Sequence, residues 1–229
     1  MDLKRQAATY ALDYVKDGML LGLGSGSTSS IFIELLGERL QAGALNDIRG
    51  VPTSQETARL ARQLGIPLVT LAECGDTPVL DLAVDGADEV DPQLNLIKGL
   101  GRAALREKIV EIHARRFLVI GDASKAVPRL GQGPLPVEIV TFESEVHVRW
   151  LNSLGCRAEL WRAADSSPVV TDNGNYLVRC WFEGGIPDAY ALARTLADRP
   201  GIVEHGLFLD MADEVALAGG TGMQIMERK

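Results

Sequence analysis

Short apolar runs alternate with amphipathic stretches along the first 130 residues of the chain. The apolar runs are typical of strands buried on both faces, and the stretches repeat apolar residues every three or four positions, as helices do. We expect strands at 19–23, 48–51, 67–71, 79–84 and 117–120, and helices at 3–16, 55–64 and 103–116, with a further helix around Ile31, Leu35 and Leu36. This alternation predicts an α/β fold, an open parallel sheet covered by helices on both faces.

The order of the predicted elements changes after the sequence GQGPLP, which begins at Gly131. The following pattern reads strand, helix, strand, strand, helix, strand, which is the split β-α-β-β-α-β arrangement of a small ferredoxin-like domain. An apolar run at 215–218 could return to the first sheet. We therefore predict two domains, with residues 1–130 and 204–229 forming the larger one and residues 131–203 inserted into it.

Composition narrows the class of protein. The chain has 229 residues, of which 46% are hydrophobic, and this is enough for a substantial core. The chain contains no run of about 18 apolar residues that would suggest a membrane span, and we expect a cytoplasmic protein. Three widely spaced cysteines favour neither a disulfide framework nor a zinc site. The net charge of -8 argues against nucleic acid as a partner, so an anionic small ligand would need local lysines.

Four candidate motifs follow predicted strands. They are SGST at 25–28, VPTS at 51–54, DGAD at 85–88 and DASK at 122–125. Ligands of open parallel sheets bind beyond the carboxyl ends of the strands, so these loops could line one crevice.

The SGST loop has the chemistry of a phosphate site. It offers backbone N–H groups, hydroxyls and the start of a helix. Ser27 stands where a dinucleotide-binding GxGxxG loop has its third glycine, and no GxxxxGK motif occurs. A phosphorylated small molecule therefore fits better than a dinucleotide. The alternative is a tight turn with an ordinary helix cap.

The region after the predicted strand at 79–84 concentrates titratable groups. Asp85 and Asp88 bracket a turn, Lys98 precedes a glycine-rich turn, and Glu107 falls in the first turns of a predicted helix. In that helix Leu105, Ile109 and Ile112 form the expected apolar face, with Glu107 off it. Together these groups suggest a site for moving protons.

Each of these groups also has a structural explanation. The two aspartates are common turn residues, glutamate suits the first turn of a helix through the helix dipole, and lysines are often surface charges. His113, His147 and His205 lie outside every motif, and we expect them to be structural.

The motifs in their order resemble those of a known family. The series GLGSGST, VDGADEV, KGLGRAALREK, DASK, LPVEIV and VTDNGN, spread over most of the chain, is similar to ribose-5-phosphate isomerase of the A type. The resemblance implies interconversion of ribose 5-phosphate and ribulose 5-phosphate without a metal or other cofactor. It also implies a homodimer or homotetramer of chains that each combine a Rossmann-like domain with a small α/β domain serving as a lid or in oligomerisation.

The resemblance also implies roles for particular residues. Glu107 would be the base, with Asp85, Asp88 and Lys98 as further catalytic residues. The implied substrate-binding residues are Lys4, Ser25, Gly26, Ser27, Thr28, Gly86, Ala87, Gly99, Leu100, Gly101 and Lys125. The chain departs from the family pattern in two places: SGST replaces TGST, and KGLG replaces KGGG.

Two other classes of function remain. A non-catalytic phosphosugar sensor could use the same glycine loop and lysines, but it would give no reason for a carboxylate at Glu107. A nucleotide-dependent oxidoreductase is disfavoured by the missing GxGxxG loop. Binding of ligand without turnover would indicate the sensor.

Overall fold

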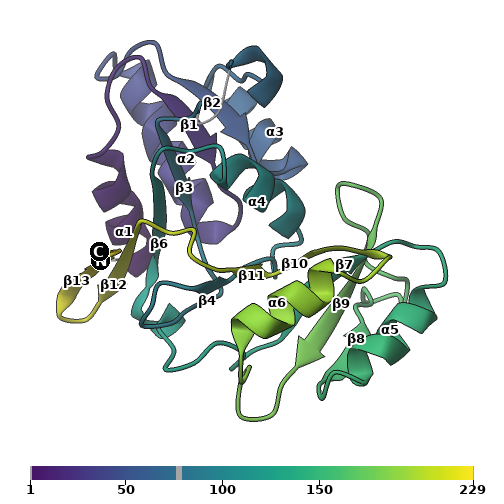
Figure 1. Ribbon diagram of the computed structural model, residues 1–229. Coiled ribbons are helices and arrows are strands. Elements are labelled where there is room, and N and C mark those ends of the chain that lie inside the picture. Colours follow the sequence, from purple (N-terminus) through teal and green to yellow (C-terminus); the bar gives the residue numbers. More distant parts are fainter. Residues whose placement is uncertain (1, 76–78, 229) are drawn as a thin grey trace. The chain divides into compact units, whose positions relative to one another are not determined.

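The computed structural model describes residues 2–75 and 79–228 and divides into two compact units (Figure 1). The first unit consists of Met1–Ala87, Arg106–Lys125 and Asp210–Lys229. The second unit consists of Asp88–Leu105 and Ala126–Leu209. The chain thus leaves the first unit twice. The domain boundaries predicted from the sequence, with 131–203 as the insertion, stay a prediction.

The first unit is built on a six-stranded sheet in the order β13-β12-β6-β3-β1-β2. Its strands are β1 (Leu20–Leu23), β2 (Arg49–Pro52), β3 (Leu82–Asp85), β6 (Phe117–Asp122), β12 (Glu214–Gly219) and β13 (Gly222–Glu227). All neighbours pair in parallel except β12 and β13, which form an antiparallel hairpin. The parallel sheet expected from the alternation of strands and helices is confirmed, as is the return of the chain's tail to it.

Helices cover both faces of this sheet. They are α1 (Leu3–Leu12), α2 (Ser27–Gln41), α3 (Gln55–Gln63) and α4 (Ala104–Glu111), and two 3-10 turns, η1 (Leu71–Glu73) and η2 (Ala123–Lys125), follow in the loops. The first three helices share one core with β1, β3 and β6, and Figure 1 shows α4 on the other side. A Cβ atom at Gly22 of β1 would lie 3.0 Å from Cγ1 of Val110. Glycine at this position therefore lets α4 pack closely on the sheet.

The second unit contains a four-stranded antiparallel sheet in the order β10-β7-β9-β8. The elements in chain order are β7 (Leu135–Ile139), α5 (Ser144–Asn152), β8 (Arg157–Leu160), β9 (Tyr176–Trp181), α6 (Ala189–Ala197) and β10 (Ile202–His205). Leu151 of α5 and Leu196 of α6 pack with Val137 and Val178 in one core. This is the predicted ferredoxin-like arrangement.

A second, smaller sheet in this unit was not predicted. It joins β4 (Glu89–Val90), β5 (Leu96–Ile97) and β11 (Leu207–Phe208), all in antiparallel pairs. Each of these strands is two residues long, so none shows a recognisable alternation of apolar and polar positions.

Three predictions about secondary structure were wrong, the first being the helix expected at 3–16, which ends at Leu12. Residues 67–71 do not form a strand, and only a single bridge joins Leu68 to Gly50. Pro67 supplies no N–H group to a ladder, which limits pairing there. The helix expected at 103–116 ends at Glu111.

Candidate active site

The glycine loop connects β1 to the start of α2. Gly26 has φ +93°, a conformation that side chains disfavour, and a Cβ atom there would meet nothing within 4 Å. Helix α2 is 15 residues long and begins directly at Ser27, and its N-cap residue, Gly26, has no side chain that could cap the first N–H groups. The first N–H groups of a helix have no partner inside it and carry the positive end of the helix dipole. The loop is therefore suited to an anion.

Lys4 adds a positive charge to this loop. Asp2 caps helix α1, with its Oδ1 atom accepting a hydrogen bond from the Lys4 amide at 3.1 Å. From the second position of α1, the Lys4 side chain reaches the loop, where Nζ donates to Oγ of Ser27 at 2.8 Å. The structure thus brings together two predicted substrate-binding residues that are 23 positions apart in the sequence.

A second lysine, Lys125, lies in η2, directly after β6. Asp122 ends this strand, and its Oδ1 atom accepts from both the amide, at 3.0 Å, and the hydroxyl of Ser124. The hydrogen bond from the Ser124 hydroxyl lowers the pKa of Asp122, and the charges of Lys125 and Lys4 add to the lowering. Both lysines therefore act on the same small region at the carboxyl end of the sheet.

Replacing Asp122 by asparagine is expected to reduce stability at neutral pH. A carboxyl group whose pKa is lowered by folding stabilises the native state above its unfolded pKa, about 3.9, and this contribution is lost as the pH falls through the folded value. Urea denaturation of both proteins at pH 7 and at about pH 3 tests this. The difference in unfolding free energy should shrink at the lower pH, and a constant difference would contradict the assignment.

Asp85 ties the glycine loop to the DGAD turn. Its side chain is buried, with 1% exposed. Oδ1 accepts from the Ser25 amide at 2.9 Å, the Ser29 hydroxyl at 2.7 Å and the Gly86 amide at 2.7 Å. Three donors thus converge on one carboxyl oxygen. Asp85 therefore fixes the positions of both loops.

Two buried threonines, which the site prediction did not include, complete the loop. Thr53 and Thr57 lie after β2 and in the first turn of α3, and their Oγ1 atoms are 2.7 and 3.2 Å from Oγ of Ser25. The motif VPTS drew attention to 51–54, but hydroxyl residues are too common at helix starts for that signal to assign a role.

Glu107 lies on the inward face of α4. It is 4% exposed, and Glu111 one turn later is 3% exposed, whereas Ile109 and Ile112 are 42% and 57% exposed. The apolar face predicted for this helix was therefore wrong, because Val110 and the two glutamates face inward instead. Burial of a carboxylate is costly, so a glutamate here needs a reason beyond the helix dipole.

Of the remaining predicted residues, Ala87 lies in the first unit, whereas Asp88 and the residues 98–101 lie in the second. The Asp88 side chain accepts from the Leu100 amide at 2.9 Å through Oδ2. Lys98 is 2% exposed, with Nζ 5.4 Å from the ring centre of Phe208. Gly99 has φ +104°, and a Cβ atom there would lie 2.8 Å from the Cβ of Ala104.

The glycine requirement of the KGLG turn thus falls on one position. Leu100 is not among the positive-φ residues of the described chain, so a side chain is tolerated where the family pattern has glycine. Gly101, the last glycine of the turn, would accept a Cβ atom without a contact within 4 Å. The departure at Leu100 is therefore compatible with the turn.

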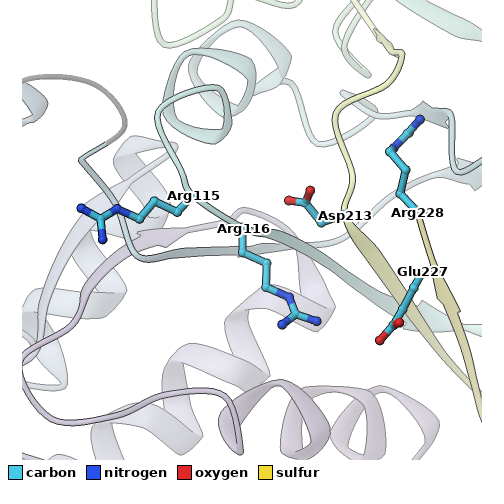
Figure 2. A pocket seen from close by; sticks show the side chains of 5 residues that line it. All are labelled: Arg115, Arg116, Asp213, Glu227 and Arg228. Atoms are coloured by element: carbon cyan, nitrogen blue, oxygen red, sulfur yellow. The ribbon is translucent and has the colours of Figure 1, made fainter.

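A pocket at the opposite, amino end of the strands in the first unit differs from this site (Figure 2). Its lining side chains are Arg115, Arg116, Asp213, Glu227 and Arg228. Arg116 is paired with the buried Glu214, and Arg228 is paired with Asp210 at 2.8 Å. Figure 2 shows the guanidinium groups of Arg115 and Arg228 pointing away from each other. The arginines do not converge on one anion.

Fold and loops together define a class of protein: an open α/β protein with a lysine-flanked glycine loop, suited to an anion, at the carboxyl ends of its strands. No described helix is long and apolar enough to cross a membrane. Among the residues at 2–75 and 79–228, no group of three or more histidine, cysteine, aspartate or glutamate side chains could hold a metal ion.

Comparison with known proteins identifies the family. Residues 49–222 match the family model of ribose 5-phosphate isomerase A (phosphoriboisomerase A). A ribose-5-phosphate isomerase A from Roseiflexus castenholzii is 52% identical over 98% of this chain and 94% of its own length. A probable chloroplastic ribose-5-phosphate isomerase 3 of Arabidopsis thaliana is 46% identical, covering 99% of this chain and 83% of its own.

Solved structures agree. Ribose 5-phosphate isomerase A from Methanocaldococcus jannaschii has a TM-score of 0.91 at 41% identity, covering 99% of this chain and 98% of its own. A D-ribose-5-phosphate isomerase in complex with phospho-erythronic acid has a TM-score of 0.94 at 41% identity, with the same coverage. The chain therefore belongs to the ribose 5-phosphate isomerase A family, and the resemblance seen in its motifs is confirmed.

Proposed function

We propose that this chain, an isomerase by family, interconverts D-ribose 5-phosphate and D-ribulose 5-phosphate through a cis-enediolate. The observation that carries the proposal is the match of nearly the whole chain to proteins named for this reaction, one of them 52% identical. The related structure with phospho-erythronic acid supports it further, because that ligand is a phosphorylated sugar acid.

The phosphate would bind at the start of α2. The amides of Gly26, Ser27 and Thr28 can donate to its oxygens, and Lys4 and Lys125 supply positive charge. The contact of Lys4 with Ser27 at 2.8 Å supports this role. Anchoring the phosphate orients the flexible sugar, so binding energy far from the reacting carbons contributes to turnover.

Glu107 would move the carbon-bound proton. In the forward direction the base takes the proton from C2 of the open-chain aldose and returns it to C1, while a proton moves from O2 to O1. The burial of Glu107 in the first turns of α4 supports this assignment. Lys98 would stabilise the developing negative charge on the enediolate.

Asp85 or Asp88 would handle the oxygen-bound protons during ring opening and enediol formation. One carboxylate oxygen of each already accepts backbone hydrogen bonds, from Ser25 and Gly86 at Asp85 and from Leu100 at Asp88. These bonds hold the two carboxylates in fixed orientations. Gly86 and Ala87 between them, with Gly99, Leu100 and Gly101, would supply backbone contacts to the sugar.

Isomerisation of ribose 5-phosphate by the purified chain tests the proposal. Because the proposed steps use only protein groups, we expect turnover to survive an excess of EDTA. The assay follows ribulose 5-phosphate formation with and without the chelator. Binding of ribose 5-phosphate without turnover would instead indicate a sensor, and loss of turnover with EDTA would contradict the metal-free mechanism.

The family resemblance also bears on the assembly and location of the chain. We propose a homodimer or homotetramer in the cytoplasm, in line with the family resemblance. The second unit would then serve as a lid or in oligomerisation.

A further inference from the structure

The hydroxyl groups around Ser25 form a closed cluster. Oγ of Ser25 lies 2.7 Å from Oγ1 of Thr53 and 3.2 Å from Oγ1 of Thr57. Both threonines are buried, with 1% and 5% exposed, whereas Ser25 is only partly buried. The threonines therefore form the buried part of the cluster, and Ser25 forms its partly exposed part at the glycine loop.

The protons of this cluster can be counted. Thr53 donates its hydroxyl proton to the carbonyl of Leu23 at 3.1 Å, and Thr57 donates its own to the carbonyl of Gly24 at 2.9 Å. A hydroxyl group has one proton and two acceptor lone pairs. The short contacts of Ser25 with the threonines therefore use the proton of Ser25. Toward a ligand its hydroxyl can only accept.

Ser54 holds this arrangement in place. Its hydroxyl donates to Oγ1 of Thr57 at 3.0 Å and accepts from the Thr57 amide, also at 3.0 Å. Thr57 is thereby fixed as a donor to Gly24 and an acceptor on its other side. Donation from Thr57 to Ser25 would break the hydrogen bond of Thr57 to Gly24, and donation from Thr53 to Ser25 would break that of Thr53 to Leu23.

The Ser27 hydroxyl differs from that of Ser25 in the direction of its hydrogen bonds. It accepts from Nζ of Lys4 at 2.8 Å, and within the described part of the chain it donates to no other group. Its proton can therefore go to a ligand. The oxygens of a phosphate dianion only accept hydrogen bonds, whereas a sugar hydroxyl can also donate.

We propose that the two serines of the loop contact different parts of the ligand. Ser27 donates a hydrogen bond to the phosphate, and Ser25 accepts one from a hydroxyl of the sugar. Ser25 is then a specificity-determining residue rather than part of the phosphate site, and Thr53 and Thr57 are positioning residues that set its polarity. The inference rests on the proposed function in taking the ligand to be a sugar 5-phosphate.

Binding measurements on matched variants test this division. Inorganic phosphate and ribitol 5-phosphate, a polyol phosphate that cannot isomerise, are titrated calorimetrically into the wild type, Ser25→Ala and Ser27→Ala. For Ser25→Ala we expect ribitol 5-phosphate to bind about three- to tenfold more weakly, the loss of one hydrogen bond, with phosphate binding unchanged within about twofold. For Ser27→Ala both ligands should weaken together.

Ser25→Thr is the conservative control, because it keeps the hydroxyl and should bind ribitol 5-phosphate within about twofold of the wild type. Thermal unfolding of each variant excludes a loss of fold. Equal weakening of both ligands by Ser25→Ala, or no weakening of either, would overturn the inference. If the wild type binds both ligands but does not isomerise ribose 5-phosphate, the proposed function fails. The titrations still test which part of the ligand each serine contacts.

Discussion

Replacing Glu107 by glutamine is expected to lower kcat by about 100-fold or more while substrate affinity stays nearly unchanged. Glutamine has the same shape but cannot take up the C2 proton, and general-base catalysis contributes about 10²- to 10⁴-fold. Steady-state kinetics with ribose 5-phosphate give kcat, and a direct titration of the variant gives the affinity. Activity close to that of the wild type would remove Glu107 from the mechanism.

Glu111→Gln is the matched control for this experiment. Glu111 lies one turn later on the same helix and is buried to the same degree, with 3% exposed against 4% for Glu107. Both variants remove one buried carboxylate from α4, so any general effect on folding should be shared. We expect Glu111→Gln to retain kcat within about tenfold of the wild type, which would locate the large loss in the chemistry of Glu107.

The parallel sheet could be predicted because its strands are buried on both faces. β3 and β6 are nearly continuous apolar runs, and such runs between amphipathic helices are typical of parallel sheets. The rule that ligands bind at the carboxyl ends of such strands then indicated the glycine loop, Asp85 and Lys125. This part of the site follows from topology alone, and the structure places these residues in the same unit.

The orientation of α4 could not be predicted in the same way. Periodicity assumes that apolar side chains face the core, and on that assumption Ile109 and Ile112 would be inside. The helix has only eight residues and buries Glu107 and Glu111 in their place. Buried carboxylates invert the pattern on which the prediction depends, and functional sites are where such local rules are expected to fail.

The hydroxyl cluster was missed for a different reason. Ser25 and Thr57 are 32 positions apart, and each is an ordinary residue for a turn or a helix start. The contact between them forms only because β1 and β2 pair in parallel, with Leu23 opposite Pro52, which brings the two loops together. The sequence predicted that the SGST and VPTS loops lie at the same edge of the sheet, but it carries no signal for the hydroxyl contacts between them.

Gly24 offers a second large effect, because it lies against the carboxylate that joins the two loops. A Cβ atom at Gly24 would stand 2.2 Å from both Cγ and Oδ1 of Asp85, far inside van der Waals contact. Asp85 is 1% exposed and is held by Ser25, Ser29 and Gly86, so it cannot move aside without breaking those hydrogen bonds. A methyl group there would displace the glycine loop itself.

Gly24→Ala is therefore expected to lower the free energy of unfolding by about 2–4 kcal/mol and to reduce kcat/KM. Urea denaturation and isomerase kinetics measure the two effects. Gly220→Ala is the control in the same unit, because a Cβ atom at Gly220 meets nothing within 4 Å, and its unfolding free energy should stay within about 1 kcal/mol of the wild type. A Gly24→Ala protein as stable and as active as Gly220→Ala would show that Asp85 is not the rigid link between the loops.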